Sequence, residues 1–328
     1  MKNYSITVIS FIILLIFTAL LSLSLGRFAI PIEQVWKILI LQGGDEIQQN
    51  VIFNLRLPRV IAAILIGASM AIAGTTFQGV FRNPLVSPGM LGVSSGACIG
   101  AALAIIWSWN IWGIQIAAFI GGIFAVTLTL AVPQIMKKDS AIILVLAGVI
   151  VSGFMGACMG LITYMADPET QLADIVYWQL GSLTKSNYTN LLYLSPIIII
   201  SGVALFAMRW RINLLSLGEQ EAKLIGVNIK LERNIMIACS TLLTASSVCL
   251  SGTIGWIGLI IPHLARMFIG DNNLQTLPIA ALIGSIFLLV IDTLARNLYV
   301  QEIPLGILTG LIGAPFFAWI LIRQKVVD

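Results

Sequence analysis

Three arginines of the sequence could bind negatively charged groups through their guanidinium donors. Arg56 and Arg59 lie on either side of Pro58, at the start of a long apolar segment, and Arg296 lies at the end of another. Each side chain could instead reach the lipid headgroups and act as an interfacial anchor. Asp292 lies four residues before Arg296, so an intrahelical ion pair could engage that arginine. The sequence leaves these alternatives open.

Few other residues are candidates for chemistry. His263 is the one histidine, and without a second histidine or a cysteine nearby a structural role is favoured over metal or haem ligation. The four cysteines lie in apolar segments and form no C-x-x-C pair, which is typical of buried small side chains. The sequence contains neither a P-loop nor a recognisable nucleophile and base. It therefore predicts no catalytic residue and no metal site, and the dispersed basic residues argue against nucleic acid binding.

The composition is that of a membrane protein. Hydrophobic residues make up 59% of the 328 residues, charged residues make up 10%, and the mean hydropathy is +1.00. Soluble domains contain about 25% charged residues. Apolar stretches of about 20 residues recur, each long enough to cross a hydrocarbon core as a helix. The sequence therefore predicts an all-α, polytopic membrane protein.

Ten apolar segments are predicted to span the membrane. The first is longer than the apolar region of a signal peptide and lacks an A-x-A site, so we interpret it as a span. The eighth is short and contains Pro262, so we expect a broken or tilted helix there. The ten predicted spans are 5–25, 58–81, 89–107, 113–133, 141–165, 190–209, 233–252, 255–269, 277–296 and 304–322.

Lysines and arginines are unevenly divided between the two sides of these spans. Of the eighteen, twelve fall on the side of the termini and six on the other side. The positive-inside rule makes the richer side cytoplasmic, with both termini inside. Arg56, Arg59 and Arg296 then lie on the outer side, against the general bias.

Glycines cluster inside the predicted spans. Their spacing places small residues on shared helix faces, which allows membrane helices to pack closely. The residues concerned are Gly67, Gly74, Gly92, Gly96 and Gly100. Acidic side chains at mid-depth are scarce, so the pattern does not indicate an ion pump.

Short cytoplasmic helices are predicted between the sixth and seventh spans, in segment 213–229. Apolar and acidic residues recur there at helical spacing, and glycines punctuate the segment. The recurring residues are Leu214, Leu217, Glu221, Leu224 and Ile225. Such helices could lie on the membrane surface or contact a cytoplasmic partner, and both alternatives remain open.

Four stretches of the sequence resemble the FecCD-type permeases of bacterial ABC importers, a family of iron-siderophore, haem and vitamin B12 uptake. They are "RLPRVIAAILIGASMAIAGTTFQGVFRNPLVSPGMLGVSSGA", "SLGEQEAKLIGV", "SGTIGWIGLIIPHLARMFIG" and "DTLARNLYVQEIPLGILTGLIGAPFFAWIL". The resemblance covers nearly the whole chain. It implies one transmembrane permease domain, residues 1–328, with the type II ABC importer fold of ten membrane helices per subunit.

The resemblance also implies partners and cargo. The permease would form a homodimer, or a heterodimer with a close paralogue, with two cytoplasmic ATPase subunits and one extracytoplasmic substrate-binding protein. ATP and Mg²⁺ would bind to the ATPase, so no cofactor is expected on this chain. The implied location is the bacterial inner membrane. The implied cargo is a metal chelate, a ferric siderophore first, with haem or cobalamin as alternatives, and a secondary transporter without an ATPase is the alternative from another class.

Specific residues match positions with known roles in this family. Those that resemble arginines docking the binding protein through its glutamates are Arg56, Arg59 and Arg296. Those that resemble ATPase-coupling residues are Leu217, Gly218, Glu221, Ala222, Leu224 and Gly226. Those that resemble the cytoplasmic gate are Asn83, Leu85 and Ser140.

Overall fold

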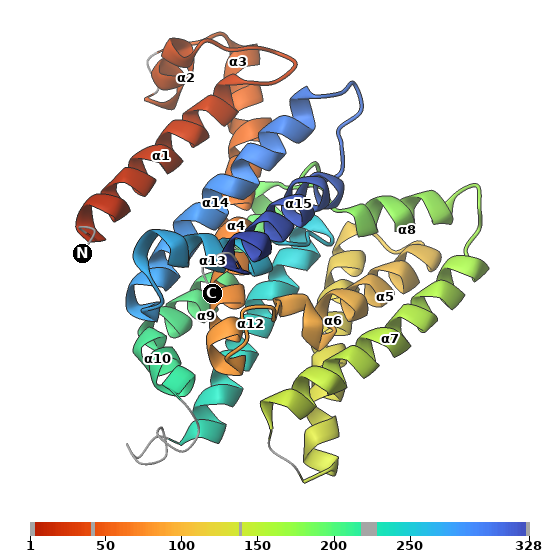
Figure 1. Cartoon of the computed structure of the whole chain (residues 1–328). Helices are drawn as coiled ribbons and strands as arrows, with labels where there is room; N and C mark the ends of the chain where they lie inside the picture. Colours follow the sequence, from red (N-terminus) through yellow and green to blue (C-terminus); the bar gives the residue numbers. More distant parts are fainter. Residues whose placement is uncertain (1–3, 41–42, 138–139, 218–227, 326–328) are drawn as a thin grey trace.

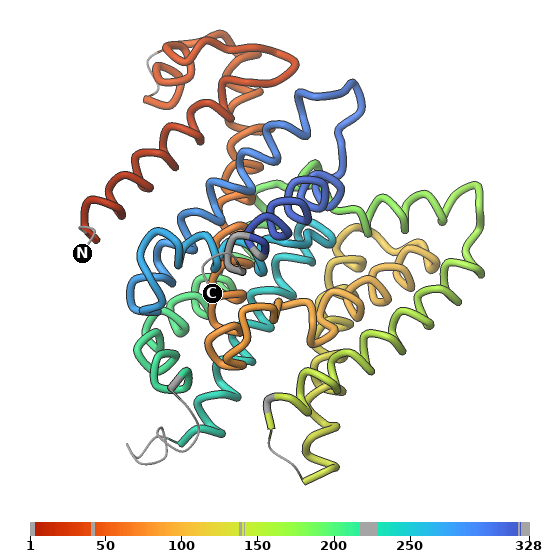
Figure 2. The backbone as a smooth tube through the Cα atoms, viewed as in Figure 1, coloured from red at the N-terminus to blue at the C-terminus, as the bar shows by residue number. Residues whose placement is uncertain are grey.

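The fold is a bundle of helices packed side by side. The computed structural model describes residues 4–40, 43–137, 140–217 and 228–325, and within these ranges the chain is helical, with no strand. Figure 1 shows the helices and Figure 2 the path of the backbone.

Ten helices correspond one to one with the ten predicted spans. Seven described helices are long and apolar enough to cross a membrane: α1 (Tyr4–Ser24), α4 (Leu57–Phe81), α6 (Ile111–Ile135), α7 (Ala141–Met165), α9 (Tyr188–Ala207), α12 (Ile229–Ser251) and α14 (Asn273–Asn297). Three further apolar helices are α5 (Val93–Ile106), α13 (Ile257–Ile269) and α15 (Leu305–Lys325). They confirm the predicted all-α, membrane-spanning fold.

Shorter helices lie in the connections. Before α4 the chain forms α2 (Ile32–Leu39), α3 (Glu46–Asn50) and the π-helix η1 (Val51–Arg56). Later connections contain the 3-10 helix η2 (Pro88–Leu91), α8 (Gln171–Leu180) and α10 (Arg209–Leu217). Of these, only α10 overlaps a helix that the sequence predicts outside the spans.

Asparagine side chains begin four of the long helices. An asparagine at the N-cap accepts a hydrogen bond from a backbone N–H that has no partner within the helix. The pairs are Asn110 with Gly113 N, Asn187 with Asn190 N, Asn228 with Leu231 N, and Asn272 with Leu274 N. These caps fix where α6, α9, α12 and α14 start.

The bundle has two ends that differ in their residues. We name one the arginine end, because Arg56, Arg59 and Arg296 lie there with α2, α3 and connection 298–304. We name the other the α10 end. Figure 1 shows α1 running toward the arginine end and α15 running away from it.

The central pair of helices is α4 and α14, which pack closely because glycines face each other. A Cβ atom on Gly67 would lie 2.3 Å from the carbonyl oxygen of Gly284, and one on Gly284 would lie 2.4 Å from that of Gly67. Ser285 Oγ donates to the carbonyl oxygen of Ile64 at 2.9 Å beside this contact.

Other glycines bring further helix pairs together. A Cβ on Gly74 would lie 2.0 Å from the carbonyl oxygen of Gly258 in α13, and one on Gly96 would lie 2.2 Å from that of Gly121 in α6. The prediction that the intramembrane glycines serve helix packing is confirmed at these positions.

Of the two alternatives predicted for the eighth span, a broken or a tilted helix, the break is wrong, because α13 continues through Pro262. The helical backbone is interrupted before Pro262, in the connection between α12 and α13. There Ile257 N donates to the carbonyl oxygen of Gly255 at 2.9 Å, across Trp256 with φ of 70°. This contact is close to a γ-turn, and it leads directly into the first residue of α13.

We expect Gly67→Ala to destabilise the protein by about 1–3 kcal/mol, because the new Cβ would force α4 and α14 apart. Gly153→Ala on α7 is the matched control, since a Cβ there meets no atom within 4 Å. The measurement is the thermal unfolding midpoint of each variant in detergent. Equal midpoints for the two variants would contradict the packing argument.

Candidate functional site at the arginine end

Arg56 closes the end of α1. It is the last residue of η1, and its Nη1 donates to the carbonyl oxygens of Leu23 at 2.6 Å and Ser24 at 3.1 Å. Its Nη2 donates to the carbonyl oxygen of Phe28 at 2.6 Å. The last carbonyls of a helix lack partners within the helix and favour a nearby cation. A Cβ on Gly26 would lie 2.4 Å from Nη2, so glycine leaves room for the guanidinium group.

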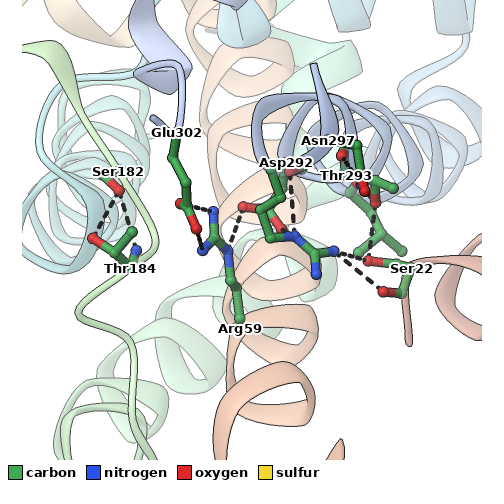
Figure 3. Close-up of polar contacts among 10 residues, drawn as sticks. Ser22, Arg59, Ser182, Thr184, Asp292, Thr293, Asn297 and Glu302 are labelled. Atoms are coloured by element: carbon green, nitrogen blue, oxygen red, sulfur yellow. Dashed lines mark hydrogen bonds and ion pairs between the residues drawn. The ribbon is translucent and has the colours of Figure 1, made fainter. Parts of the chain in front are cut away.

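Arg59 binds two carboxylates from distant parts of the chain. Its Nε donates to Asp292 Oδ1 on α14 at 2.7 Å. Its Nη1 and Nη2 lie 3.1 Å and 2.8 Å from the two oxygens of Glu302, in the connection between α14 and α15. Figure 3 shows Arg59 between these two acidic side chains. Nη1 and Nη2 thus face the two oxygens of Glu302 as a fork, with a hydrogen bond at Oε1 and an ion-pair contact at Oε2.

Arg296 shares Asp292 with Arg59. Its Nε lies 3.2 Å from Asp292 Oδ2, one helical turn away, which confirms the predicted intrahelical pair. Its Nη2 donates to Ser22 Oγ at 2.7 Å and to the carbonyl oxygen of Ser22 at 3.2 Å. Arg296 therefore joins α14 to the end of α1.

The burial of these groups shows that the three arginines are not lipid anchors. Arg56, Arg59 and Arg296 are 6%, 7% and 8% exposed, and their guanidinium groups bind protein atoms. Asp292 is fully buried, with an arginine on each carboxylate oxygen. Asp292 Oδ1 accepts a hydrogen bond from Arg59, and Oδ2 is paired with Arg296 by charge. Buried charges are tolerated when they are paired with opposite charges.

Glu302 is the member of this group that can be reached from outside. Its side chain is 30% exposed, whereas Asp292 beneath it has no exposed surface. The neighbouring Val300 is held in place because Arg27 donates to its carbonyl oxygen. At the surface of the arginine end, the Nη1 and Nη2 donors of Arg59 are thus occupied by Glu302.

Comparison with known proteins decides the family. Residues 14–323 match the model of the FecCD transport family. The chain belongs to this family.

Two relatives and one solved structure illustrate what this FecCD chain is similar to. A molybdate import system permease protein of Haemophilus influenzae is 40% identical over 317 residues, which cover 95% of this chain and 94% of the relative. A Helicobacter pylori protein named as an iron chelatin transport system permease is 43% identical over 275 residues, covering 84% and 83%. A structure described as an inward-facing conformation of a metal-chelate type ABC transporter has a TM-score of 0.89 at 39% identity, covering 96% of this chain and 98% of that chain.

The predicted gate residues of the FecCD chain lie near the α10 end. After α4 the chain turns at Arg82, with φ of 50°, and Asn83 Oδ1 accepts a hydrogen bond from Leu85 N at 2.9 Å. Leu85 is exposed, and Ser140 precedes α7, where its carbonyl oxygen accepts a hydrogen bond from Leu144 N at 3.1 Å. Their role in gating stays a prediction.

The predicted coupling segment is described in part. Leu217 is the last residue of α10, and the other predicted coupling residues lie outside the described ranges: Gly218, Glu221, Ala222, Leu224 and Gly226. Helix α10 begins at Arg209, four residues before the predicted segment, and its buried residues are Ile212 and Leu215 rather than Leu214. The apolar spacing predicted a helix but not which face is buried.

Sequence reasoning missed Glu302 and Ser22 as partners of the arginines. Glu302 is 243 positions from Arg59, and Ser22 is 274 positions from Arg296. No local spacing links residues so far apart. Among the residues that the structure describes, no group of three or more His, Cys, Asp or Glu could hold a metal ion.

We expect Asp292→Asn to destabilise the protein by about 3–5 kcal/mol, because two buried arginines would lose their shared carboxylate. Adding Arg296→Gln should recover part of this loss, since it restores the balance of buried charge. Thermal unfolding in detergent measures both variants, with Asn297→Ala on the exposed end of α14 as control. If the double variant is no more stable than Asp292→Asn, charge pairing is not what stabilises this site.

Proposed function

We propose that this chain is the permease subunit of an ATP-driven importer and that it carries a metal chelate. The observation that supports this most strongly is the match, over 96% of the chain, to the solved metal-chelate type ABC transporter. The FecCD family match over residues 14–323 agrees with it. Because the sequence lacks a nucleotide-binding motif, ATP and Mg²⁺ would bind to a separate ATPase.

The proposed assembly follows from this role. Two permease subunits, identical or closely related, would bind two cytoplasmic ATPase subunits and one extracytoplasmic substrate-binding protein. The proposed location is the bacterial inner membrane, with both termini in the cytoplasm. The division of lysines and arginines supports this orientation and places the arginine end outside.

A ferric siderophore is the cargo that we propose first. The 43% identical relative named for iron chelatin transport supports this choice. An oxyanion is the second candidate, because the relative named for molybdate import is 40% identical over almost the whole chain. Haem and cobalamin are further alternatives.

Uptake into proteoliposomes tests the cargo and the energy source together. The permease, its ATPase and its binding protein would be reconstituted and offered a ferric hydroxamate siderophore, haemin, cyanocobalamin or molybdate. We expect ATP-dependent accumulation of the ferric hydroxamate, with the other three compounds at the level of empty vesicles. ATP-dependent uptake of molybdate instead would favour the oxyanion importer, and uptake without ATPase would favour a secondary transporter.

The arginine end is the proposed docking surface for the binding protein. Arg56, Arg59 and Arg296 were predicted to bind its glutamates, yet all three are buried and engaged within this chain. Of their partners, Glu302 is the carboxylate that is partly exposed. A carboxylate of the binding protein could reach the Arg59 fork if Glu302 moved away, because both would use the same two donors.

We expect Glu302→Gln to tighten binding of the substrate-binding protein by up to about fivefold, because it removes a competing charge of the strength typical of exposed ion pairs. Glu46→Gln, an exposed acid on α3 at the same end, is the matched control. The measurement is the affinity of purified binding protein for the detergent-solubilised permease at low and high salt. Weaker binding by Glu302→Gln would mean that Glu302 assists docking, and equal binding would mean that Arg59 does not take part.

A further inference from the structure

Helix α10 is fixed to the membrane helices at three points. Ile212 is fully buried against α4, where a Cβ on Gly79 would lie 2.3 Å from Ile212 Cγ2. Arg211 forms an ion pair with Glu232 near the start of α12. Asn213 binds the start of α14, and Figure 1 shows α10 beside that end of α14.

The side-chain amide of Asn213 both donates and accepts a hydrogen bond at the start of α14. Its Nδ2 donates to Asn272 Oδ1 at 2.8 Å, and its Oδ1 accepts a hydrogen bond from the backbone N–H of Asn273 at 2.8 Å. Asn272 is itself the N-cap of α14 and accepts from Leu274 N at 3.1 Å. Asn213 thus completes, from another helix, the cap of α14. An amide side chain can donate and accept at the same time, whereas ionised aspartate lacks the donor and leucine lacks both functions.

The contact at Asn213 lies at one end of a stiff pair of helices. Helices α4 and α14 run antiparallel, with Gly79 near Asn273, Gly67 packed on Gly284, and Arg59 paired with Asp292. From Arg59 to Gly79 the rise along α4 is about 30 Å, the thickness of a bilayer core. A displacement of α10 that reaches the first turn of α14 would therefore be passed to the arginine end.

We propose that Asn213 is a positioning residue that couples the movement of α10 to α14 during transport. The inference rests on the proposed function, because it assumes that an ATPase acts on the segment that follows α10. Asn213 touches neither cargo nor nucleotide in this proposal. It acts by holding α10 on the helix pair that leads to the arginine end.

The test compares uptake of a ferric hydroxamate siderophore with ATP hydrolysis in the reconstituted transporter. We expect Asn213→Leu to lower the uptake per ATP hydrolysed by about tenfold, the scale set by losing one or two neutral hydrogen bonds. Asn213→Asp keeps the acceptor for Asn273 N and should give an intermediate ratio. Thr127→Leu is the control, because Thr127 is an exposed residue of α6, outside both ends, whose hydroxyl donates to the carbonyl oxygen of Ile123 within the same helix.

The uptake per ATP hydrolysed distinguishes a coupling role of Asn213 from a role in the stability of the fold. If Asn213 merely stabilises the fold, uptake and hydrolysis will fall together and the ratio will stay at the wild-type value, which would overturn the inference. If Asn213→Leu does not assemble, the ratio of Asn213→Asp decides, because that change is smaller. If the wild type takes up no ferric hydroxamate with ATP, the proposed cargo is wrong, and a readout that does not depend on the cargo then tests the inference.

A second readout does not depend on the cargo. A fluorophore on Tyr299→Cys, an exposed position in connection 298–304, would report movement at the arginine end after the four native cysteines are replaced. We expect ATP with vanadate to change its emission in the otherwise wild-type chain and not in the Asn213→Leu variant. An equal change in emission in the otherwise wild-type chain and in the Asn213→Leu variant would contradict the proposal that Asn213 passes the movement of α10 to α14.

Discussion

The carboxylate of Asp292 is the charge on which the arginine end depends. It lies fully buried on a membrane helix, where an unpaired charge would be strongly destabilising. Arg59 neutralises one oxygen and Arg296 approaches the other, so α4 and α14 are joined at this point. Because Arg296 also binds Ser22, the end of α1 is fixed by the same group. One buried acid thereby determines the positions of three helices.

This ion pair forms because glycines set the register of α4 and α14 along their length. Gly67 is eight residues after Arg59, and Gly284 is eight residues before Asp292, so the two contacts belong to one antiparallel register. Eight residues rise about 12 Å and rotate about 80° beyond two turns, so both residues still lie within the broad face that one helix turns toward the other. Close approach at the glycines lets the short Asp292 side chain reach Arg59 directly.

Much of the fold follows from local patterns in the sequence, and much of the site does not. Apolar length located ten apolar helices, seven of which are long enough to cross a membrane, and glycine spacing indicated the close packing at Gly67 and Gly96. The pair of Asp292 and Arg296 was predictable because both lie on one helix. The Arg59 fork with Glu302 and the tie of Asn213 to α14 depend on how distant segments meet, which no local spacing encodes. The predicted break at Pro262 is wrong for a related reason: neighbouring helices can accommodate a proline within a membrane helix, and local spacing does not reveal those neighbours.

The three arginines differ in how readily each could be released from its partners within the chain. Arg56 satisfies carbonyl oxygens at the end of α1, and Arg296 binds Asp292 and Ser22, so displacing either would break contacts that hold the end of α1 in place. Arg59 has two carboxylate partners, and releasing Glu302 would still leave it paired with Asp292. An incoming carboxylate could therefore exchange with Glu302 while the buried core of the site stays neutral. Any partner that binds this end through carboxylates would gain most from Arg59, whereas Arg56 and Arg296 would contribute by keeping α1, α4 and α14 in place around it.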